Sequence, residues 1–250
     1  MRTKSAVALN VGLVFLLVQA AGAAEIRVIC SNGVKAVLED LGPQFERTSG
    51  HKLNIQFSST ATLKQRIDGG EAFDVAFLTS DAIDDLIQSG KLAAATRADL
   101  ARTGIGVGYR KGAPKPDVAT AAAIKALLLR AQSIAYTRDG ASRPGIDKMF
   151  DRLGIAADVR GKSMLQAAGQ APGTVARGEA EIVLTLISEI LPVAGVELAG
   201  PLPAEFQNYT SFAAAAATEG GNAQAVQALI KFVAGPTSAP VFKAKGMEPR

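Results

Sequence analysis

Short apolar runs alternate with amphipathic stretches along almost the whole chain. The apolar runs have the length of strands, and in most of the intervening segments apolar residues recur at helical spacing. Strands are expected at 25–30, 52–57, 74–78, 103–109, 133–137, 161–167, 180–186 and 209–217. Helices are expected between them, with a late one carrying an apolar stripe over 226–233. This alternation predicts an α/β fold in which helices cover both faces of a parallel sheet.

Prolines interrupt the pattern at two places. Pro43 is expected to kink or break the helix that follows the first strand, because proline removes a backbone donor from the helix interior. Pro192, Pro201 and Pro203 indicate irregular connections after the strand at 180–186. About 225 residues arranged in this way fit one large domain or two smaller lobes.

The first residues have the pattern of a secretory signal. Arg2 and Lys4 form a basic start, residues 7–18 form an apolar run, and 21–23 (Ala-Gly-Ala) form a small-residue cleavage site. We therefore expect a signal peptide at 1–23, cleavage after Ala23 and a periplasmic mature protein. The only cysteine, Cys30, lies inside the first strand, so it is interpreted as a small buried apolar residue and not as half of a disulfide.

Charge and composition exclude several classes of function. The formal charge of +4 falls to 4 − 2 = +2 when Arg2 and Lys4 are removed, and no Lys/Arg cluster alternates with aromatic residues, so a nucleic-acid partner is not expected. His51, the only histidine, precedes the second strand and is interpreted as a surface turn residue. A Ser–His–Asp site or a histidine metal site therefore has little support, and neither a metal nor a cofactor is expected.

Four hydroxyl residues follow the second predicted strand and open a helix: Ser58, Ser59, Thr60 and Thr62. The first N–H groups of a helix lack partners inside it, and the helix dipole places partial positive charge there. The cluster therefore suits an anion, although a single Ser or Thr at this position would also be an ordinary N-cap.

Several segments resemble the molybdate-binding group of periplasmic solute-binding proteins. They are 31–38 (SNGVKAVL), 57–63 (FSSTATL), 70–78 (GEAFDVAFL), 177–182 (RGEAEI), 200–203 (GPLP) and 242–247 (FKAKGM). The resemblance implies the type II periplasmic binding fold, in which two lobes, each a mainly parallel sheet flanked by helices, enclose a ligand cleft. It implies strand crossings near 102–105 and 209–212. The first lobe would hold 24–102 and 211–250, and the second would hold 103–210.

The hydroxyl cluster and the resemblance together give the candidate ligand-binding positions, to which Arg143 is added because it lies beside a predicted helix start in the second lobe; the alternative for Arg143 is a solvated loop residue. The candidate positions are Ser31, Asn32, Gly33, Ser58, Ser59, Thr60, Arg143, Gln170, Thr185 and Tyr209. Two of them depart from the family pattern: Gly33 falls where the first-loop serine is expected, and Thr185 or its neighbour Leu184 where a tyrosine is expected. These departures argue against molybdate and favour an organic acid, which Arg143 could bind in a bidentate manner.

The leading functional expectation is a binding protein that captures a small anion for an ABC-type importer, acts as a monomer and contacts the importer's membrane permease. The alternative from another class is an aconitate isomerase on the same scaffold. With no histidine in the cleft, its acid or base would be Asp139, Lys35 or Tyr209. A third possibility is a sensor that passes the ligand signal to a membrane receptor.

Overall fold

The computed structural model describes residues 23–250. The predicted signal peptide therefore lies outside the described residues except at Ala23. No helix among the described residues is long and apolar enough to cross a membrane.

The described chain alternates strands and helices, as the sequence pattern predicts. The strands are β1 (Glu25–Ser31), β2 (Lys52–Ser58), β3 (Val75–Thr79), β4 (Ala98–Arg110), β5 (Ile134–Thr137), β6 (Ser163–Gln166), β7 (Ile182–Leu186), β8 (Val196–Pro201), β9 (Tyr209–Ala216) and β10 (Glu248–Pro249). The helices are α1 (Asn32–Ser49), α2 (Thr60–Asp68), α3 (Ser80–Gln88), α4 (Ala121–Arg130), α5 (Arg143–Leu153), α6 (Ala156–Arg160), α7 (Ala171–Ala176), α8 (Ile187–Ile190), α9 (Ala223–Ala234) and α10 (Ala239–Ala244).

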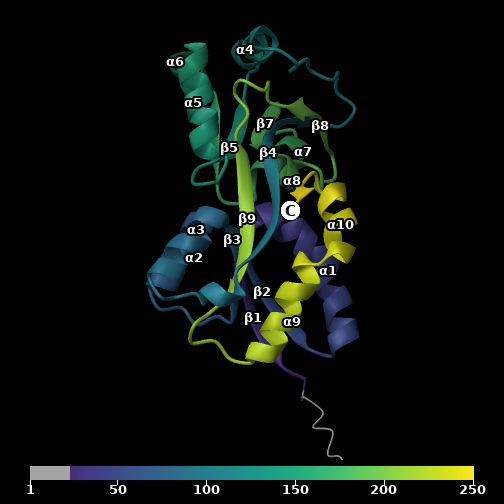
Figure 1. The fold of residues 1–250 in the computed structure, drawn as a ribbon. Coiled ribbons are helices and arrows are strands. Elements are labelled where there is room, and N and C mark those ends of the chain that lie inside the picture. The colour runs from purple at the N-terminus through teal and green to yellow at the C-terminus, as the bar shows by residue number, and fades with distance from the viewer. Residues whose placement is uncertain (1–22) are drawn as a thin grey trace, which may run out of the picture.

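Two lobes lie one above the other along the molecule (Figure 1). Here lobe 1 denotes β1–β3 with α1–α3, α9 and α10, and lobe 2 denotes β5–β8 with α4–α8. The strands pair in the order β2-β1-β3-β9-β4-β7-β5-β6, and β8 and β10 also pair with β4. β4 and β9 pass between the lobes as an antiparallel pair. The sheet is therefore mixed, with parallel strands inside each lobe and antiparallel strands at the crossing.

The direction of the strands decides which of their ends lie at the junction between the two lobes. β1, β2 and β3 are parallel to one another, and β3 is antiparallel to β9 and therefore runs in the same direction as β4. β7 is antiparallel to β4, and β5 and β6 run with β7. The carboxyl ends of the parallel strands in both lobes consequently point toward the junction, the place where α/β sheets bind ligands.

In the lobe 1 sheet, β3 and the second half of β1 are buried on both faces, which explains their continuous apolar runs. Along β1, Val28 and Cys30 belong to the core cluster that contains α1, while Ile29 belongs to the cluster with Leu63 of α2 and Leu86 of α3. Alternate residues of a strand point to opposite faces, so both sides of such a strand must be apolar. The predicted role of Cys30 as a buried apolar residue is confirmed, and burial raises the pKa of its thiol.

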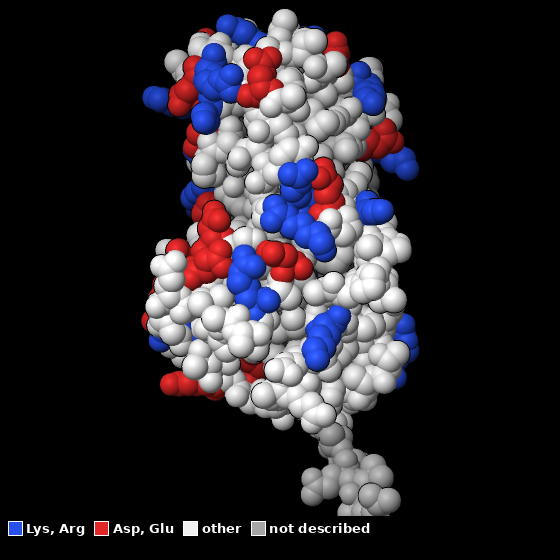
Figure 2. Space-filling model, viewed as in Figure 1, with Lys and Arg blue, Asp and Glu red and all other residues white. Residues whose placement is uncertain are grey.

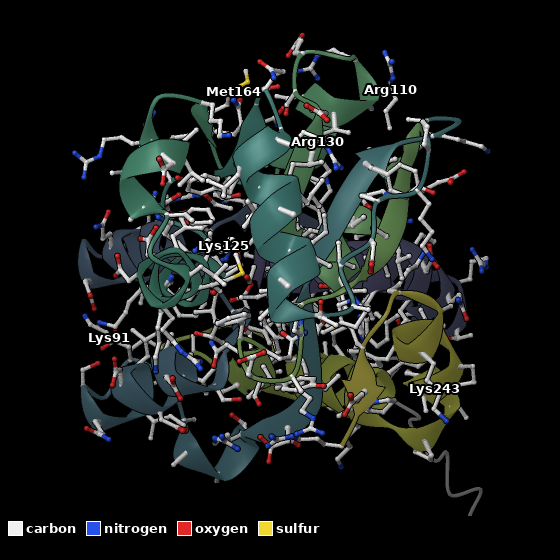
Figure 3. All side chains as sticks on the ribbon, turned by 90° about the horizontal axis from the view of Figure 1, so that it is seen from above. Lys91, Arg110, Lys125, Arg130, Met164 and Lys243 are labelled. Carbon is white, nitrogen blue, oxygen red and sulfur yellow. The ribbon has the colours of Figure 1, made fainter. Side chains whose placement is uncertain are left out.

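Lobe 2 is closed at the end far from lobe 1 by α4. Figure 3 looks down on this helix, with Lys125 and Arg130 labelled along it. The ammonium of Lys125 donates to the carbonyl of Leu153, 2.8 Å away, at the end of α5. A cation beside the last carbonyl of a helix interacts favourably with the helix dipole, so this contact ties α4 to α5.

Three local expectations need correction. α1 does not end at Pro43 but continues to Ser49. Pro43 is exposed, so the carbonyl that loses its partner can bond to water. The region expected to be irregular contains β8, which pairs with β4 through a shift of register between Val107 and Gly108. A six-residue strand ending in Gly-Pro has the composition of a turn, and its pairing depends on the distant β4. Likewise, β4 begins five residues before the predicted start.

One side chain completes the strand pairing at the crossing. The Oε1 atom of Gln207 accepts a hydrogen bond from the Ile105 N–H at 2.7 Å, and its Nε2 atom donates to the Ile105 carbonyl at 2.9 Å. Ile105 is fully buried, so its backbone groups need such partners. Gln207 thereby replaces a strand at the point where β4 enters lobe 2.

Replacing Gln207 by Ala should destabilise the junction. The change leaves the Ile105 N–H without its partner, whereas the Ile105 carbonyl still accepts the Leu202 N–H at 3.0 Å. An unpaired buried polar group costs about 1–3 kcal/mol. Calorimetry of the mature protein should then show a melting temperature lower by roughly 2–4 °C for each kcal/mol lost. Asn208→Ala, at the exposed neighbouring position, is the matched control. Equal melting temperatures for the two variants would contradict this role of Gln207.

Candidate functional site

Two serines occupy strand ends of lobe 1 at the junction. Ser31 ends β1 and is 4% exposed, and its side chain makes no capping bond to α1. Ser59 follows β2, is also 4% exposed, and caps α2: its Oγ atom accepts a hydrogen bond from the Thr62 N–H at 3.1 Å. The predicted hydroxyl cluster thus lies at a helix N-terminus, and Ser31 keeps a hydroxyl that its own helix does not use.

A carboxylate from lobe 2 reaches this hydroxyl cluster. The Oδ2 atom of Asp139, in the loop after β5, accepts hydrogen bonds from Ser59 Oγ at 2.8 Å and from Thr62 Oγ1 at 3.1 Å. Thr60 is adjacent, and its Oγ1 atom accepts a long bond of 3.4 Å from the Thr79 N–H. The hydroxyls after β2 therefore bind a carboxylate within this structure.

A second contact between the lobes involves Asn32. A Cβ atom placed on Gly169, in the turn before α7, would lie only 3.0 Å from the Asn32 Nδ2 atom. Gly169 has φ of +75°, a conformation that favours glycine. Gln170 follows directly and is exposed. Asn32 and Gln170, both predicted site residues, are thus brought to the same part of the junction.

Gly33 holds the start of α1 against the crossing strands. A Cβ atom at this position would lie 2.3 Å from Cζ of Phe212 on β9 and 3.1 Å from Cδ1 of Leu186 on β7. No real Cβ tolerates the shorter distance without displacement of its neighbour, so this close approach requires glycine. The hydroxyl expected here by analogy with the family is replaced by tight packing.

Three further hydroxyls at strand ends are buried and have no hydrogen-bond partner among the described residues. They are the side chains of Ser80, Thr137 and Ser188. Thr137 ends β5, while Ser80 and Ser188 lie in the first turns of the helices after β3 and β7. Buried polar groups are rarely left unpaired in native proteins, so each of these hydroxyls requires a water or a ligand.

Thr185 belongs to a short carboxyl network and does not donate its proton to the junction. Its Oγ1 atom lies 2.5 Å from Oε2 of Glu189. Glu189 keeps some exposed surface, yet burial raises the pKa of its carboxyl and the Thr185 bond offsets this only in part. Its helix α8 packs against α1, which begins with Asn32 and Gly33. A carboxyl that holds its proton more tightly than usual therefore lies on a helix beside the start of α1.

Arg143 and Tyr209 make other contacts than those expected. The Arg143 Nε atom pairs with Asp147 at 2.6 Å, and the guanidinium lies 5.0 Å from the centre of the Tyr136 ring. Tyr209 is 48% exposed, and the Arg102 guanidinium lies 4.6 Å from its ring centre. These contacts group Arg143 with α5 and Tyr209 with the crossing strands.

Lys35 and Asp139, the other two candidates for an acid or base, lie in different surroundings. Lys35 is exposed, lies 3.7 Å from Glu39 and is 5.5 Å from the ring centre of Phe57. Asp139 lies at the junction itself. His51 accepts a hydrogen bond from the Ala24 N–H at 3.2 Å at the opposite end of the lobe 1 strands, which confirms its interpretation as a turn residue.

The surface charge has no dominant sign on the face seen in Figure 2, where Lys/Arg and Asp/Glu side chains are interspersed. Surface ion pairs occur among the described residues, such as Lys64–Asp68 at 3.2 Å. Within residues 23–250, no group of three or more His, Cys, Asp or Glu side chains is placed to hold a metal ion.

Comparison with known proteins identifies the family. The family model described as bacterial extracellular solute-binding protein matches residues 26–248. The chain belongs to this family. It is 29% identical over 230 residues to an aconitate isomerase of a Pseudomonas species, covering 90% of this chain and 87% of that protein. It is 27% identical over 246 residues to the molybdate-binding protein of Azotobacter vinelandii, covering 96% and 95%.

The solved structure of the periplasmic molybdate-binding protein of Azotobacter vinelandii has the same two-lobed fold. The TM-score is 0.76 at 18% identity, with 89% of this chain and 98% of that chain covered. The predicted type II periplasmic binding fold and the predicted resemblance to the molybdate-binding group are thereby confirmed.

Sequence reasoning missed part of this site. Glu189 and the unpartnered hydroxyls of Ser80, Thr137 and Ser188 were not predicted. The sequence did contain a signal for Ser80 and Ser188: each lies two residues after the end of a predicted strand, as Ser59 does. Nothing local indicated that Asp139 would meet Ser59, which lies 80 positions earlier.

Proposed function

We propose that this protein binds a small organic carboxylate between its lobes and delivers it to the permease of an importer. The lobe 1 loops 31–33 and 58–60 would bind the ligand from one side, and the lobe 2 segments 140–143 and 167–170 from the other. The observation that carries the proposal is the pair of hydroxyls, Ser59 and Thr62, that already bind the carboxylate of Asp139. An external carboxylate can use the same donors.

The donors around this position are largely uncharged. Ser31, Asn32, Ser58, Thr60 and Gln170 supply hydroxyl and amide groups, and α2 adds the partial positive charge of its N-terminus. Such donors hold an anion through hydrogen bonds, and bonds to a charged group contribute about 1.5–3 kcal/mol each. A ligand with two or three carboxylates could engage both lobes at once.

Arg143 remains a proposed anchor for a second carboxylate, with one condition. Its guanidinium is paired with Asp147 in this structure, so a ligand would have to compete with that carboxylate. We propose that Thr185 affects the ligand only indirectly, through the hydrogen bond of its hydroxyl to Glu189. Tyr209 would likewise act indirectly, through its place at the start of the crossing strand β9. In this mechanism the lobes of a monomeric periplasmic protein open and close about β4 and β9.

The names of the relatives support an anionic ligand. One is a molybdate-binding protein and another an aconitate isomerase, whose named substrate is a tricarboxylate. Gly33 lacks the hydroxyl expected there for molybdate, and the hydroxyl of Thr185, where a tyrosine is expected, is bonded to Glu189. An organic acid therefore fits the described donors better than molybdate does.

A thermal-shift and calorimetric panel tests this proposal. At a hundredfold excess over its dissociation constant, a ligand of the folded state stabilises by about 2.7 kcal/mol, or roughly 5–10 °C in melting temperature at this size. We expect such a shift with a di- or tricarboxylate such as citrate or cis-aconitate. A shift with molybdate or tungstate alone would contradict the proposed ligand class.

In the same panel, Ser31→Ala should weaken carboxylate binding roughly ten- to a hundredfold, the effect of losing one bond to a charged group. The melting temperature of the ligand-free variant should change little, because Ser31 makes no capping bond. Ser89→Ala, at the far end of α3, is the matched control. Equal affinity in the two variants would remove Ser31 from the site.

The second candidate function is isomerisation of aconitate, and Glu189 favours it. An allylic shift removes a proton from a methylene carbon, moves the double bond and adds a proton to the other former alkene carbon. One carboxyl with a pKa near the working pH can both accept and donate that proton. Glu189 has a pKa shifted in this direction by burial and lies on a helix packed against α1.

Incubating the purified protein with cis-aconitate and following trans-aconitate by chromatography separates the two functions. Stoichiometric binding without conversion would support a binding protein. Many product molecules per protein would establish the isomerase, and Glu189→Gln should then reduce turnover by about 10²- to 10⁴-fold, the usual contribution of a proton-transfer group. Glu197→Gln, on β8 and bonded to Tyr109, is the control. Equal turnover in both variants would exclude Glu189 as that group.

A further inference from the structure

Asp139 connects the two lobes through hydrogen bonds. It belongs to the loop between β5 and α5 in lobe 2, and its Oδ2 atom accepts both the Ser59 hydroxyl and the Thr62 hydroxyl of lobe 1. Ser59 is buried and Asp139 is exposed, so the carboxylate approaches from the solvent side. This hydrogen-bonded contact spans the junction beside the ends of β2 and β5.

Asp139 uses both hydroxyl protons of the Ser59–Thr62 pair. Each hydroxyl carries one proton, and the Ser59 oxygen also accepts the Thr62 N–H at 3.1 Å. Ser59 Oγ and Thr62 Oγ1 lie 3.0 Å apart, but neither can donate to the other while both donate to Asp139. An incoming anion that needs either proton therefore finds both already in use.

The charge of Asp139 is held by the same groups that would hold a ligand. Within residues 23–250, no Lys or Arg side chain forms an ion pair with Asp139. The partial positive charge at the start of α2 acts on any carboxylate placed there. A ligand carboxylate and Asp139 would repel each other if both occupied this position.

We propose that Asp139 is an internal competitor of the ligand: its carboxylate occupies the Ser59–Thr62 donors in the empty protein, holds the lobes together, and is displaced when an external carboxylate binds. This inference rests on the proposed anion site. It assigns Asp139 a role opposite to that of a ligand-binding residue, since removing it should tighten binding. The Asp139 contact would also keep the lobes of the ligand-free protein closer together than they would be if only β4 and β9 connected them.

The distance between the lobes tests the competitor without any ligand. Spin labels can be placed at Gln88→Cys on α3 and Lys148→Cys on α5, both exposed, while the only native cysteine, Cys30, is fully buried. In the empty protein, Asp139→Ala should shift the measured distance distribution toward longer values. Asp151→Ala, an exposed acidic residue of the same lobe, should leave it unchanged. Unchanged distances in the Asp139 variant would overturn the proposal.

Calorimetry with cis-aconitate and citrate provides the second readout. The Asp139→Ala variant should bind the anion that the wild type binds roughly 1.5- to fivefold more tightly, the range expected for an exposed charged contact. Weaker or equal binding would overturn the proposal, because it would make Asp139 a ligand contact or a bystander. If neither anion binds any variant, the proposed function fails, and the distance measurement still decides whether Asp139 joins the lobes.

Thr62→Val keeps the proposal testable if Asp139→Ala does not fold. This variant removes one of the two hydroxyls that bind Asp139 and leaves the backbone N–H that caps onto Ser59. The distance distribution should then move partway toward the open form. A distribution identical to that of the wild type would contradict a joining role for the Asp139 contact.

Discussion

The antiparallel pairing of β4 with β9 determines how the two lobes face each other. These two strands connect the lobes, and every parallel strand takes its direction from them. Because β3 runs with β4 while β7 runs against it, the carboxyl ends of both sets of strands meet at the junction. The loops that carry hydroxyl and amide side chains are thereby brought face to face.

Close packing at the crossing limits what the site can contain. Phe212 of β9 and Leu186 of β7 press on Gly33, so the first turn of α1 has no room for a side chain there. Gln207 supplies the strand-like partners of Ile105 where β4 enters lobe 2. The backbone of the site is therefore built on the strands about which the lobes would move, and its donors change their relative positions when the lobes do.

The site combines neutral donors with internal carboxylates. Ser59 and Thr62 hold Asp139, and Thr185 donates to Glu189. Hydroxyl groups can exchange one carboxylate for another without leaving a bare positive charge behind. This distinguishes the site from one built on a free arginine, whose removal from its partner would leave a desolvated ion. On the proposed function, binding and release of an anion would be an exchange of hydrogen-bond partners across the junction.

Local pattern was enough to predict much of the fold and the position of the hydroxyl cluster at the start of α2. The apolar runs of β1, β3 and β7 are buried on both faces, and the hydroxyls at 58–62 follow a strand and open a helix, so both features are encoded in neighbouring residues. The family resemblance added the two lobes and the crossings. β8 escaped prediction because its pairing depends on a distant strand and not on its own composition.

The rest of the site depends on side-chain partners that local pattern does not contain. Arg143 had the position expected of an anchor, but Asp147, four residues later, takes its guanidinium. The raised pKa of Glu189 results from burial that only the assembled fold creates. The contact of Asp139 with Ser59 joins residues 80 positions apart, and no periodicity links them.

A crystal structure with the tightest-binding carboxylate present would show whether a ligand replaces Asp139. We expect a ligand carboxylate between the lobes that accepts hydrogen bonds from Ser59 and Thr62, with Asp139 moved out of hydrogen-bonding distance of both. A ligand bound elsewhere on the molecule, with the 2.8 Å contact between Ser59 and Asp139 intact, would contradict this expectation.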